Sequence, residues 1–226
     1  MATDLHLNID ADGIATLLID VADRSMNVLT PRLIEELAAA IEAAVADARV
    51  RGVLLASGKS AFMPGADLTL LVRQFARRMT LAEAVAANRD FSRVVRRLET
   101  CGKPVAAAIN GLALGGGLEL CLACHYRVLA DDPKAVIGLP EVTVGLLPGG
   151  GGTQRLPRLI GIEKALPLLL EGRNLRPEEA LKLRIVHELA PREQLLAAAR
   201  RWLLGQPVAQ QPWDVKGYQL PGGSNI

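Results

Sequence analysis

An α/β fold is what this sequence predicts, and two observations favour it. Segments with the alternating pattern of strands are interleaved with segments whose apolar residues recur at helical spacing. Half of the residues are hydrophobic but only 3% are aromatic, so alanine, leucine, valine and isoleucine must form the core. With 226 residues the chain has the size of one substantial domain, since domains usually span about 100–200 residues.

The chain opens with a predicted β-hairpin. Apolar residues alternate with polar ones at 5–9, a turn follows at 10–13, and a second apolar strand occupies 14–19. Thr30 and Pro31 then supply the N-cap and the first residue of a helix, because a threonine hydroxyl accepts from free amides and proline fits the first helical position.

Two buried strands flank a long helix in the middle of the chain. The strands are expected at 52–56 and 105–110, and Thr80 with Glu83 predicts a capping box at the start of the helix between them, which runs to about residue 100. The apolar residues expected on its inner face are Leu81, Val85, Phe91, Val94, Val95 and Leu98.

The C-terminal third is predicted to hold a capped helix and a short strand within 173–189, then a terminal helix at 194–204. After that the periodicity stops, and residues 206–226 contain three prolines and three glycines. We therefore expect a domain at 1–205 followed by a linker-like tail at 206–226.

Charge and composition exclude several classes of protein. A formal charge of +2 gives no reason to expect nucleic-acid binding, so the partner should be a small molecule or another subunit. The N-terminus lacks the pattern of a signal peptide, and no run of about 18 apolar residues predicts membrane insertion. Three cysteines indicate a reducing compartment rather than a disulfide framework, so a cytoplasmic location is expected.

Two glutamates in glycine-rich surroundings are the candidate catalytic groups. Glu119 follows the triple glycine at 115–117, where a strand should pass into a helix with unpaired first amides. Glu141 precedes a second glycine run that begins at Gly149. Two carboxylates near free amides suit general acid and base chemistry on a substrate that develops negative charge on oxygen, although either glutamate could instead only cap amides.

The motifs NGLALGGGLEL, GLPEVTVGLLPGGGGTQRLPRLIG and SAFMPGADL resemble those of the crotonase superfamily, specifically the enoyl-CoA hydratases. The resemblance covers roughly residues 5 to 205. The spacing of the two glutamates and the tail PWDVKGYQLPGG are similar to the N-terminal hydratase/isomerase region of the multifunctional fatty acid β-oxidation enzyme, α-subunit type. The implied fold is a spiral of repeated ββα units with a helical C-terminal part, which is short here.

The resemblance implies a role for each matching residue. The amides of Ala66 and Gly116 would form an oxyanion hole for the thioester carbonyl, and Gly149 N–H would help to hold a water. Glu119 would deprotonate that water for attack at the β-carbon. Glu141, expected to be the more buried of the two, would deliver a proton to the α-carbon.

The expected substrate is a coenzyme A thioester, with no further cofactor and no metal, because the sequence contains no cluster of His, Cys, Asp and Glu ligands. Asp67 is expected to act mainly as a structural hydrogen-bonding residue. The resemblance places the CoA phosphates near Arg73, Arg77 and Arg78, with Arg24 and Lys59 as further candidates. Asp67 and Leu68 are candidate contacts to the substrate or to CoA.

Two other motifs are expected to be structural. Cys121, Cys124 and His125 spell the C-x-x-C-H pattern of haem attachment, but they fall in an apolar helix of a chain without an export signal. Gly58, Lys59 and Ser60 look like the end of a phosphate-binding loop, yet the preceding glycine is one residue too far away for that motif.

Hydration of trans-2-enoyl-CoA to 3-hydroxyacyl-CoA in fatty acid β-oxidation is therefore the leading hypothesis. The alternatives are Δ3-Δ2-enoyl-CoA isomerisation, which uses the same enolate, and a non-catalytic acyl-CoA-binding module. Stand-alone hydratases usually have further C-terminal helices that cover the acyl pocket and build a trimer. We therefore expect either a homo-oligomer, a trimer or a multiple of it, or the remainder of a multifunctional enzyme to complete this chain.

Overall fold

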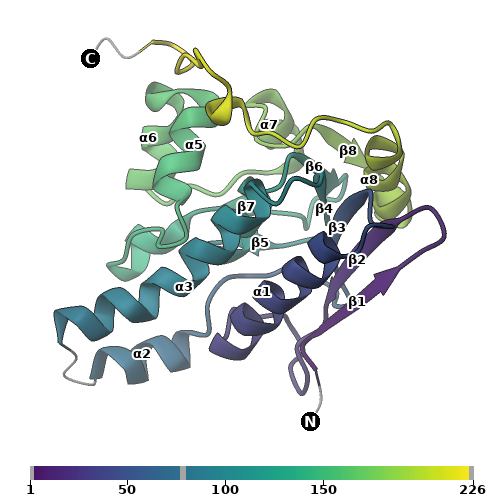
Figure 1. Ribbon diagram of the computed structural model, residues 1–226. Coiled ribbons are helices and arrows are strands. Elements are labelled where there is room, and N and C mark those ends of the chain that lie inside the picture. Colours follow the sequence, from purple (N-terminus) through teal and green to yellow (C-terminus); the bar gives the residue numbers. More distant parts are fainter. Residues whose placement is uncertain (1–2, 77–79, 224–226) are drawn as a thin grey trace.

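The computed structural model describes residues 3–76 and 80–223 and confirms the α/β fold. Within that part of the chain, the main sheet has six strands in the order β1-β2-β3-β4-β6-β8, seen on the right in Figure 1. Only β1 and β2 are antiparallel, as the predicted hairpin requires. The strands are β1 (Leu5–Ile9), β2 (Ile14–Ile19), β3 (Gly52–Ser57), β4 (Val105–Ile109), β6 (Tyr126–Ala130) and β8 (Glu188–Ala190).

A second, small sheet accounts for the spiral. It contains β5 (Ala113–Leu114) paired in parallel with β7 (Ile137–Gly138), and Met63 extends it through a bridge to Ala113. Starting from β3, β4 and β6, the chain passes from the main sheet to this small sheet and then into helical structure. The expected repetition of ββα units is confirmed.

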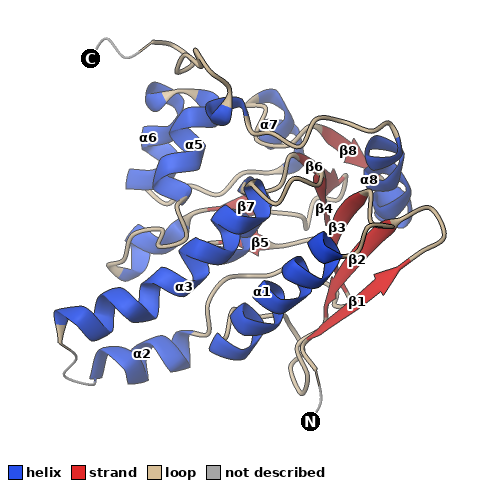
Figure 2. Ribbon diagram, viewed as in Figure 1, coloured by secondary structure: helices blue, strands red, loops and turns tan. Residues whose placement is uncertain are grey.

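Helices cover both sides of the main sheet (Figure 2). Helix α8 lies on one side of the strands, while α1 and α3 lie on the other. None of the helices described is both long and apolar enough to cross a membrane. The helices are α1 (Pro31–Ala46), α2 (Leu68–Ala76), α3 (Leu81–Glu99), α4 (Gly116–Leu122), α5 (Gly152–Ile160), α6 (Ile162–Leu170), α7 (Pro177–Lys182) and α8 (Leu195–Leu204), with 3-10 turns η1 (Pro140–Val144), η2 (Arg192–Gln194) and η3 (Pro212–Asp214).

The predicted helix starts are confirmed. The Thr30 hydroxyl accepts from the Leu33 amide at 3.1 Å, and Thr80 with Glu83 forms the reciprocal capping box. One expectation for α3 is wrong, because Val85 is 45% exposed rather than turned inward. That end of α3 extends beyond the sheet in Figure 1, so no neighbouring strand covers it. The side chain of Leu81 lies outside what the structure describes.

Small and aliphatic side chains form the core, as the composition predicts, and every residue of β4 is buried. The C-x-x-C-H residues belong to this core. Cys121 and Cys124 are buried, and His125 Nδ1 accepts from the Val105 amide at 3.0 Å. The histidine side chain therefore fixes the start of β4, in agreement with the structural interpretation of that motif.

The segment at 206–223 differs from the expected linker in the contacts that it makes. It has little regular structure, but the buried amide of Gln211 donates to the carbonyls of Ala123 and Cys124 at 2.9 and 3.1 Å. Asp214 forms an ion pair with Arg96 at 2.7 Å. The segment is therefore fastened to the domain, although its sequence has no apolar period.

Candidate active site

A cavity of about 240 Å³ contains both candidate glutamates. It lies where α1, α2 and α3 meet the starts of α4 and α5 and the η1 turn. Most of its wall is apolar, which suits an acyl chain, and the glutamates and backbone amides supply the polar groups. The lining residues are Leu29, Thr30, Pro31, Ile34, Ala66, Asp67, Leu70, Leu71, Phe91, Gly116, Glu119, Glu141, Leu146, Leu147, Gly149 and Gly150.

Glu119 lies in the first turn of α4 and is 2% exposed. Its Oε1 accepts a hydrogen bond of 2.7 Å from the amide of Gly152, at the start of α5. The second glycine run wraps around the carboxylate so closely that a Cβ at Gly150 would lie 2.8 Å from Glu119 Oε2. Glycine is therefore required there to let backbone approach the carboxylate.

Glu141 lies on η1 and is half-buried. The expectation that it is the more buried glutamate is wrong, because the glycine run covers Glu119 instead. Glu141 Oε1 lies beside the turn at Gly115, and a Cβ added to Gly115 would be 3.0 Å from that oxygen. Its Oε2 is buried and has no hydrogen-bond partner among the described residues, so that oxygen is available to a bound molecule or a proton.

The two carboxyl groups have different electrostatic environments. Burial first of all, and the charge of Glu119 in addition, raise the pKa of Glu141 to about 7, so the two carboxyl groups are close enough to interact. Burial also raises the pKa of Glu119, but the amides of the second glycine run and the charge of Arg155 oppose that rise. Neighbouring carboxyls in unequal surroundings suit opposite roles in proton transfer.

The amides of Ala66 and Gly116 both border the cavity. Within the described residues, neither amide has a hydrogen-bond acceptor. Gly115, with φ of +53°, turns the chain from β5 into α4, and the first amides of a helix have no partner within it. The two N–H groups are therefore available to an oxyanion.

Gly117 explains how closely α4 packs beneath this site. A Cβ at that position would lie 2.1 Å from the carbonyl oxygen of Met63, a backbone atom that cannot easily move aside. The third glycine of the triple run thus allows the helix to approach the segment that carries Ala66. Gly149 also lines the cavity.

Asp67 has a structural role, as expected. Its Oδ1 accepts from the amides of Thr69 and Leu70 at 2.9 and 3.1 Å, which caps the start of α2. Its Oδ2 accepts from Arg24 at 2.7 Å. These hydrogen bonds, first of all the one from Leu70, lower the pKa of Asp67, so it is a poor candidate for a proton donor.

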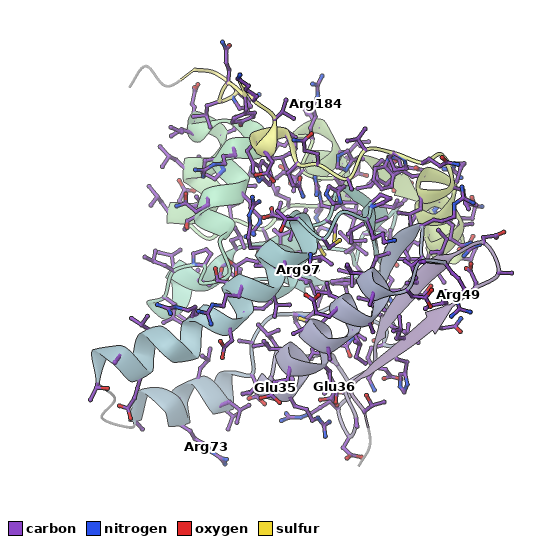
Figure 3. The ribbon with its side chains drawn as sticks, viewed as in Figure 1. Glu35, Glu36, Arg49, Arg73, Arg97 and Arg184 are labelled. Carbon is purple, nitrogen blue, oxygen red and sulfur yellow. The ribbon has the colours of Figure 1, made fainter. Side chains whose placement is uncertain are left out.

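Among the side chains that the structure describes, the other candidate CoA contacts do not line the cavity. Arg24 reaches it only through Asp67, while Lys59 pairs with Asp20 at 2.6 Å. Arg73 lies on the exposed side of α2 (Figure 3). The side chain of Leu68, and all of Arg77 and Arg78, lie outside the described residues. Contact of these residues with CoA stays a prediction.

The sequence pattern did not reveal two parts of the site. Phe91 was expected only in the core, but it also lines the cavity and packs against Gly116 and Gly150. Arg155 was not singled out, yet it lies directly behind the second glycine run. Within the described residues, His, Cys, Asp and Glu form no group of three or more that could hold a metal ion.

Comparison with known proteins defines the class of protein that this fold and site represent. The family model for enoyl-CoA hydratase/isomerase matches residues 12–213. The enoyl-CoA hydratase of Bacillus anthracis superposes with a TM-score of 0.81 and 32% identity, covering 90% of this chain and 76% of that one. The corresponding enzyme of Geobacillus kaustophilus has a TM-score of 0.81 and 30% identity, covering 89% and 74%. The chain belongs to the enoyl-CoA hydratase/isomerase family.

Within this family, the chain is similar to the fatty acid oxidation complex subunit alpha of Shewanella amazonensis. The two are 45% identical over 202 residues, which is 89% of this chain. The subunit from Shewanella sp. strain ANA-3 is 44% identical over 200 residues, 88% of this chain. The chain spans 28% of the length of either relative, and the resemblance to the α-subunit branch is confirmed.

Proposed function

We propose that this chain hydrates trans-2-enoyl-CoA thioesters to 3-hydroxyacyl-CoA as a step of fatty acid β-oxidation. The observation that carries the proposal is that two carboxyl groups of unequal environment border one apolar cavity together with two amides that have no acceptor among the described residues. Addition of water to a 2-enoyl thioester needs these groups, namely a base, an acid, a support for negative charge on the thioester oxygen and an apolar surface for the acyl chain.

In this mechanism the Ala66 and Gly116 amides bind the thioester carbonyl oxygen. Glu119 takes a proton from water while the water oxygen bonds to the β-carbon, and the electrons of the double bond move onto the thioester as an enolate. Glu141 then delivers a proton to the α-carbon, which completes the addition of water. In other enzymes the loss of one oxyanion donor costs about 3–4 kcal/mol of transition-state stabilisation, so the two amides would be a main source of rate.

The surroundings of the carboxyl groups support this division of roles. The Gly152 amide donates to Glu119, and a hydrogen bond to a carboxylate stabilises the charged form that acts as a base. Glu141, with its unpartnered Oε2 and a pKa of about 7, holds a proton in a substantial fraction of molecules at neutral pH. A general acid is most effective when its pKa lies near the working pH.

Isomerisation of 3-enoyl-CoA to 2-enoyl-CoA is a second candidate, favoured by the presence of two carboxyls on one cavity. One carboxyl would remove an α-proton and the other would return a proton to the γ-carbon through the same stabilised enolate. Rates measured with 2-enoyl and 3-enoyl thioesters of equal chain length separate the two reactions, since hydration consumes only the former directly.

We also propose that another surface completes the cavity, either from a second copy in a homo-oligomer or from the rest of a longer polypeptide. Leu147 lines the cavity but is 74% exposed, so one apolar wall faces outward. The chain spans only 28% of the length of the two α-subunit relatives named above. If thioester binding by calorimetry is accompanied by no turnover, the chain is an acyl-CoA-binding module; rapid turnover excludes that alternative.

A further inference from the structure

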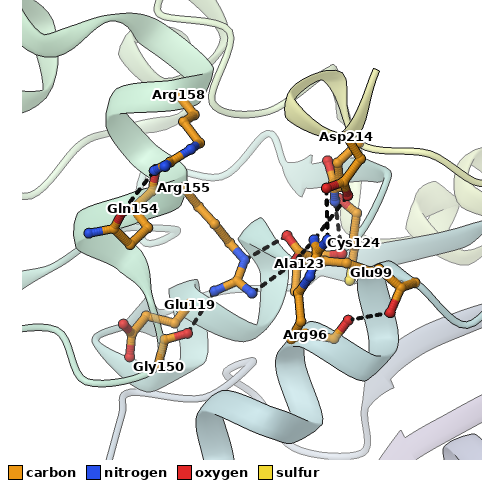
Figure 4. A network of polar contacts seen from close by, with 12 residues as sticks. Arg96, Glu99, Glu119, Ala123, Cys124, Gly150, Gln154, Arg155, Arg158 and Asp214 are labelled. Atoms are coloured by element: carbon orange, nitrogen blue, oxygen red, sulfur yellow. Dashed lines mark hydrogen bonds and ion pairs between the residues drawn. The ribbon is translucent and has the colours of Figure 1, made fainter. Parts of the chain in front are cut away.

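A polar chain behind the second glycine run connects Glu119 with the C-terminal segment (Figure 4). Arg155 is nearly buried, and its Nη1 donates to the carbonyl oxygen of Gly150 at 2.7 Å. The guanidinium lies so close to the turn that a Cβ at Gly151, where φ is +99°, would be 2.3 Å from Nη1. The turn that donates to Glu119 from one side is therefore held by Arg155 from the other.

Glu99 holds Arg155 in place. Its Oε1 accepts from Arg155 Nε at 2.7 Å and its Oε2 from Nη2 at 2.8 Å, in the two-pronged geometry that fixes a guanidinium in both position and orientation. Both side chains are buried, at 8% and 1% exposure for the arginine and the glutamate. Neither lines the cavity, so neither can contact a substrate there.

The series of polar contacts continues to the surface. Arg96 donates to Glu99 Oε2 at 2.9 Å and pairs with both carboxylate oxygens of Asp214, at 2.7 and 2.9 Å. Asp214 ends the η3 turn of the C-terminal segment. Figure 4 shows these contacts as an unbroken series from Asp214 to the Gly150 carbonyl, beside the Glu119 carboxylate.

We propose that Glu99 and Arg155 are positioning residues for Glu119, and that Arg96 carries this support to Asp214 in the C-terminal segment. The inference deepens the proposed function, because it concerns the group assigned as base. If these polar contacts are weakened, the second glycine run can move away from Glu119. Its amide hydrogen bonds then weaken, the carboxylate is less stabilised, and the group both loses its orientation and binds a proton more readily.

The choice of variant follows from burial. Glu99→Gln is the obvious change, but breaking a buried ion pair on one side leaves an unpaired buried charge and is strongly destabilising. Asp214→Asn acts at the exposed end of the chain, where the Arg96 side chain is 48% exposed, and should leave the fold intact.

The exposed pair between Arg97 and Glu42 supplies a matched control. It lies one residue along α3 from Arg96, at the Arg97 that Figure 3 labels, and has contacts of 2.6 and 2.9 Å. None of the contacts described for this pair leads to the glycine run. Glu42→Gln therefore removes the same kind of charge from the same kind of pair.

The experiment measures the titration of the Glu119 carboxyl by ¹³C NMR in the full chain labelled at glutamate Cδ, with Glu119→Gln to assign the resonance. The other charged groups that face Glu119 in the described structure are Arg155 and Glu141, and both variants retain them. Removing the negative charge of Asp214 or Glu42 would by itself lower the titration midpoint of Glu119. Positioning predicts the opposite for Asp214→Asn, a rise of about half a pH unit, or threefold in the dissociation constant.

Turnover gives a second readout in the same proteins. At pH values below the Glu119 midpoint, we expect Asp214→Asn to lower kcat about threefold, because there the half-unit rise reduces the ionised fraction of the base threefold. KM should stay unchanged, since the acyl-binding wall is untouched. If Asp214→Asn matches Glu42→Gln in both midpoint and kcat, the positioning inference is overturned. If the native chain turns over no enoyl thioester but the midpoint still rises, positioning is supported and the proposed hydration fails instead.

Discussion

At the scale of single residues, the two glutamates differ because backbone reaches only one of them. The second glycine run closes over Glu119 and donates to it, whereas Glu141 Oε2 is buried among groups that offer it no hydrogen bond within the described structure. Both groups are glutamate carboxyls, so their side-chain chemistry is the same. The proposed division into base and acid thus rests on the positions of Gly150 and Gly152, which have no side chains of their own.

This difference predicts how stability depends on pH at Glu141. Its pKa is about 7 in the folded chain, against a usual value of 4.5. Between these values the folded state binds more proton than the unfolded state, so raising the pH costs stability until the pH passes 7. Glu141→Gln cannot ionise. We compare the free energy of unfolding of this variant with that of the native chain. From pH 5 to pH 8 the difference should shift by about 1–3 kcal/mol in favour of the variant, after allowance for partial exposure.

Urea unfolding at several pH values measures this difference, and Glu36→Gln, at a partly exposed position that does not line the cavity, serves as the control. A constant difference between Glu141→Gln and the native chain across that range would mean that Glu141 titrates as an exposed carboxyl does.

At the scale of elements, sequence reasoning located what depends on local pattern. The hairpin, the capped helices α1 and α3 and both glutamates in their glycine-rich turns follow from residues close together in the chain. The two-residue strands β5 and β7 are too short to show a period. The greater burial of Glu119 was missed because it results from Gly152, which is 33 residues away.

The packing of α4 makes a prediction of its own. Gly117→Ala places a methyl group against the Met63 carbonyl oxygen, so helix and small sheet must separate. We expect a loss of about 3 kcal/mol or more, and a melting temperature lower by about 6 °C or more for a domain of this size. Gly205→Ala, at the exposed end of α8 with φ of −70°, should melt close to the native temperature. Equal melting temperatures for the two variants would show that α4 can shift without cost.

At the scale of the whole molecule, the C-terminal segment is part of the domain's structure. It has no apolar period, so the pattern of residues 206–226 suggested a linker, but polar anchors fasten it. Gln211 binds the carbonyls at the end of α4, and Asp214 binds Arg96 on α3. Such anchors consist of single side chains meeting distant backbone, which leaves no periodic signal in a sequence.

Gln211→Ala tests this attachment. The change removes the donor to the buried carbonyl oxygen of Ala123, while that of Cys124 still accepts from Arg127. Leaving a buried polar group unpaired costs about 1–3 kcal/mol. We expect that loss in urea unfolding, whereas Gln210→Ala, next to it but exposed, should stay within about 0.5 kcal/mol of the native chain. If both variants unfold together with the native chain, the segment at 206–223 contributes nothing to stability.

The central claim is that these 226 residues carry the groups for enoyl-thioester hydration. Its most direct test is the loss of enoyl-thioester absorbance when the chain is added to crotonyl-CoA, with Glu119→Gln and Glu141→Gln alongside. We predict steady loss with the native chain and a rate at least about 100-fold lower in each variant, as expected for removal of a general acid or base. Unchanged rates in both variants, or no loss with a folded chain that binds the thioester, would contradict the account.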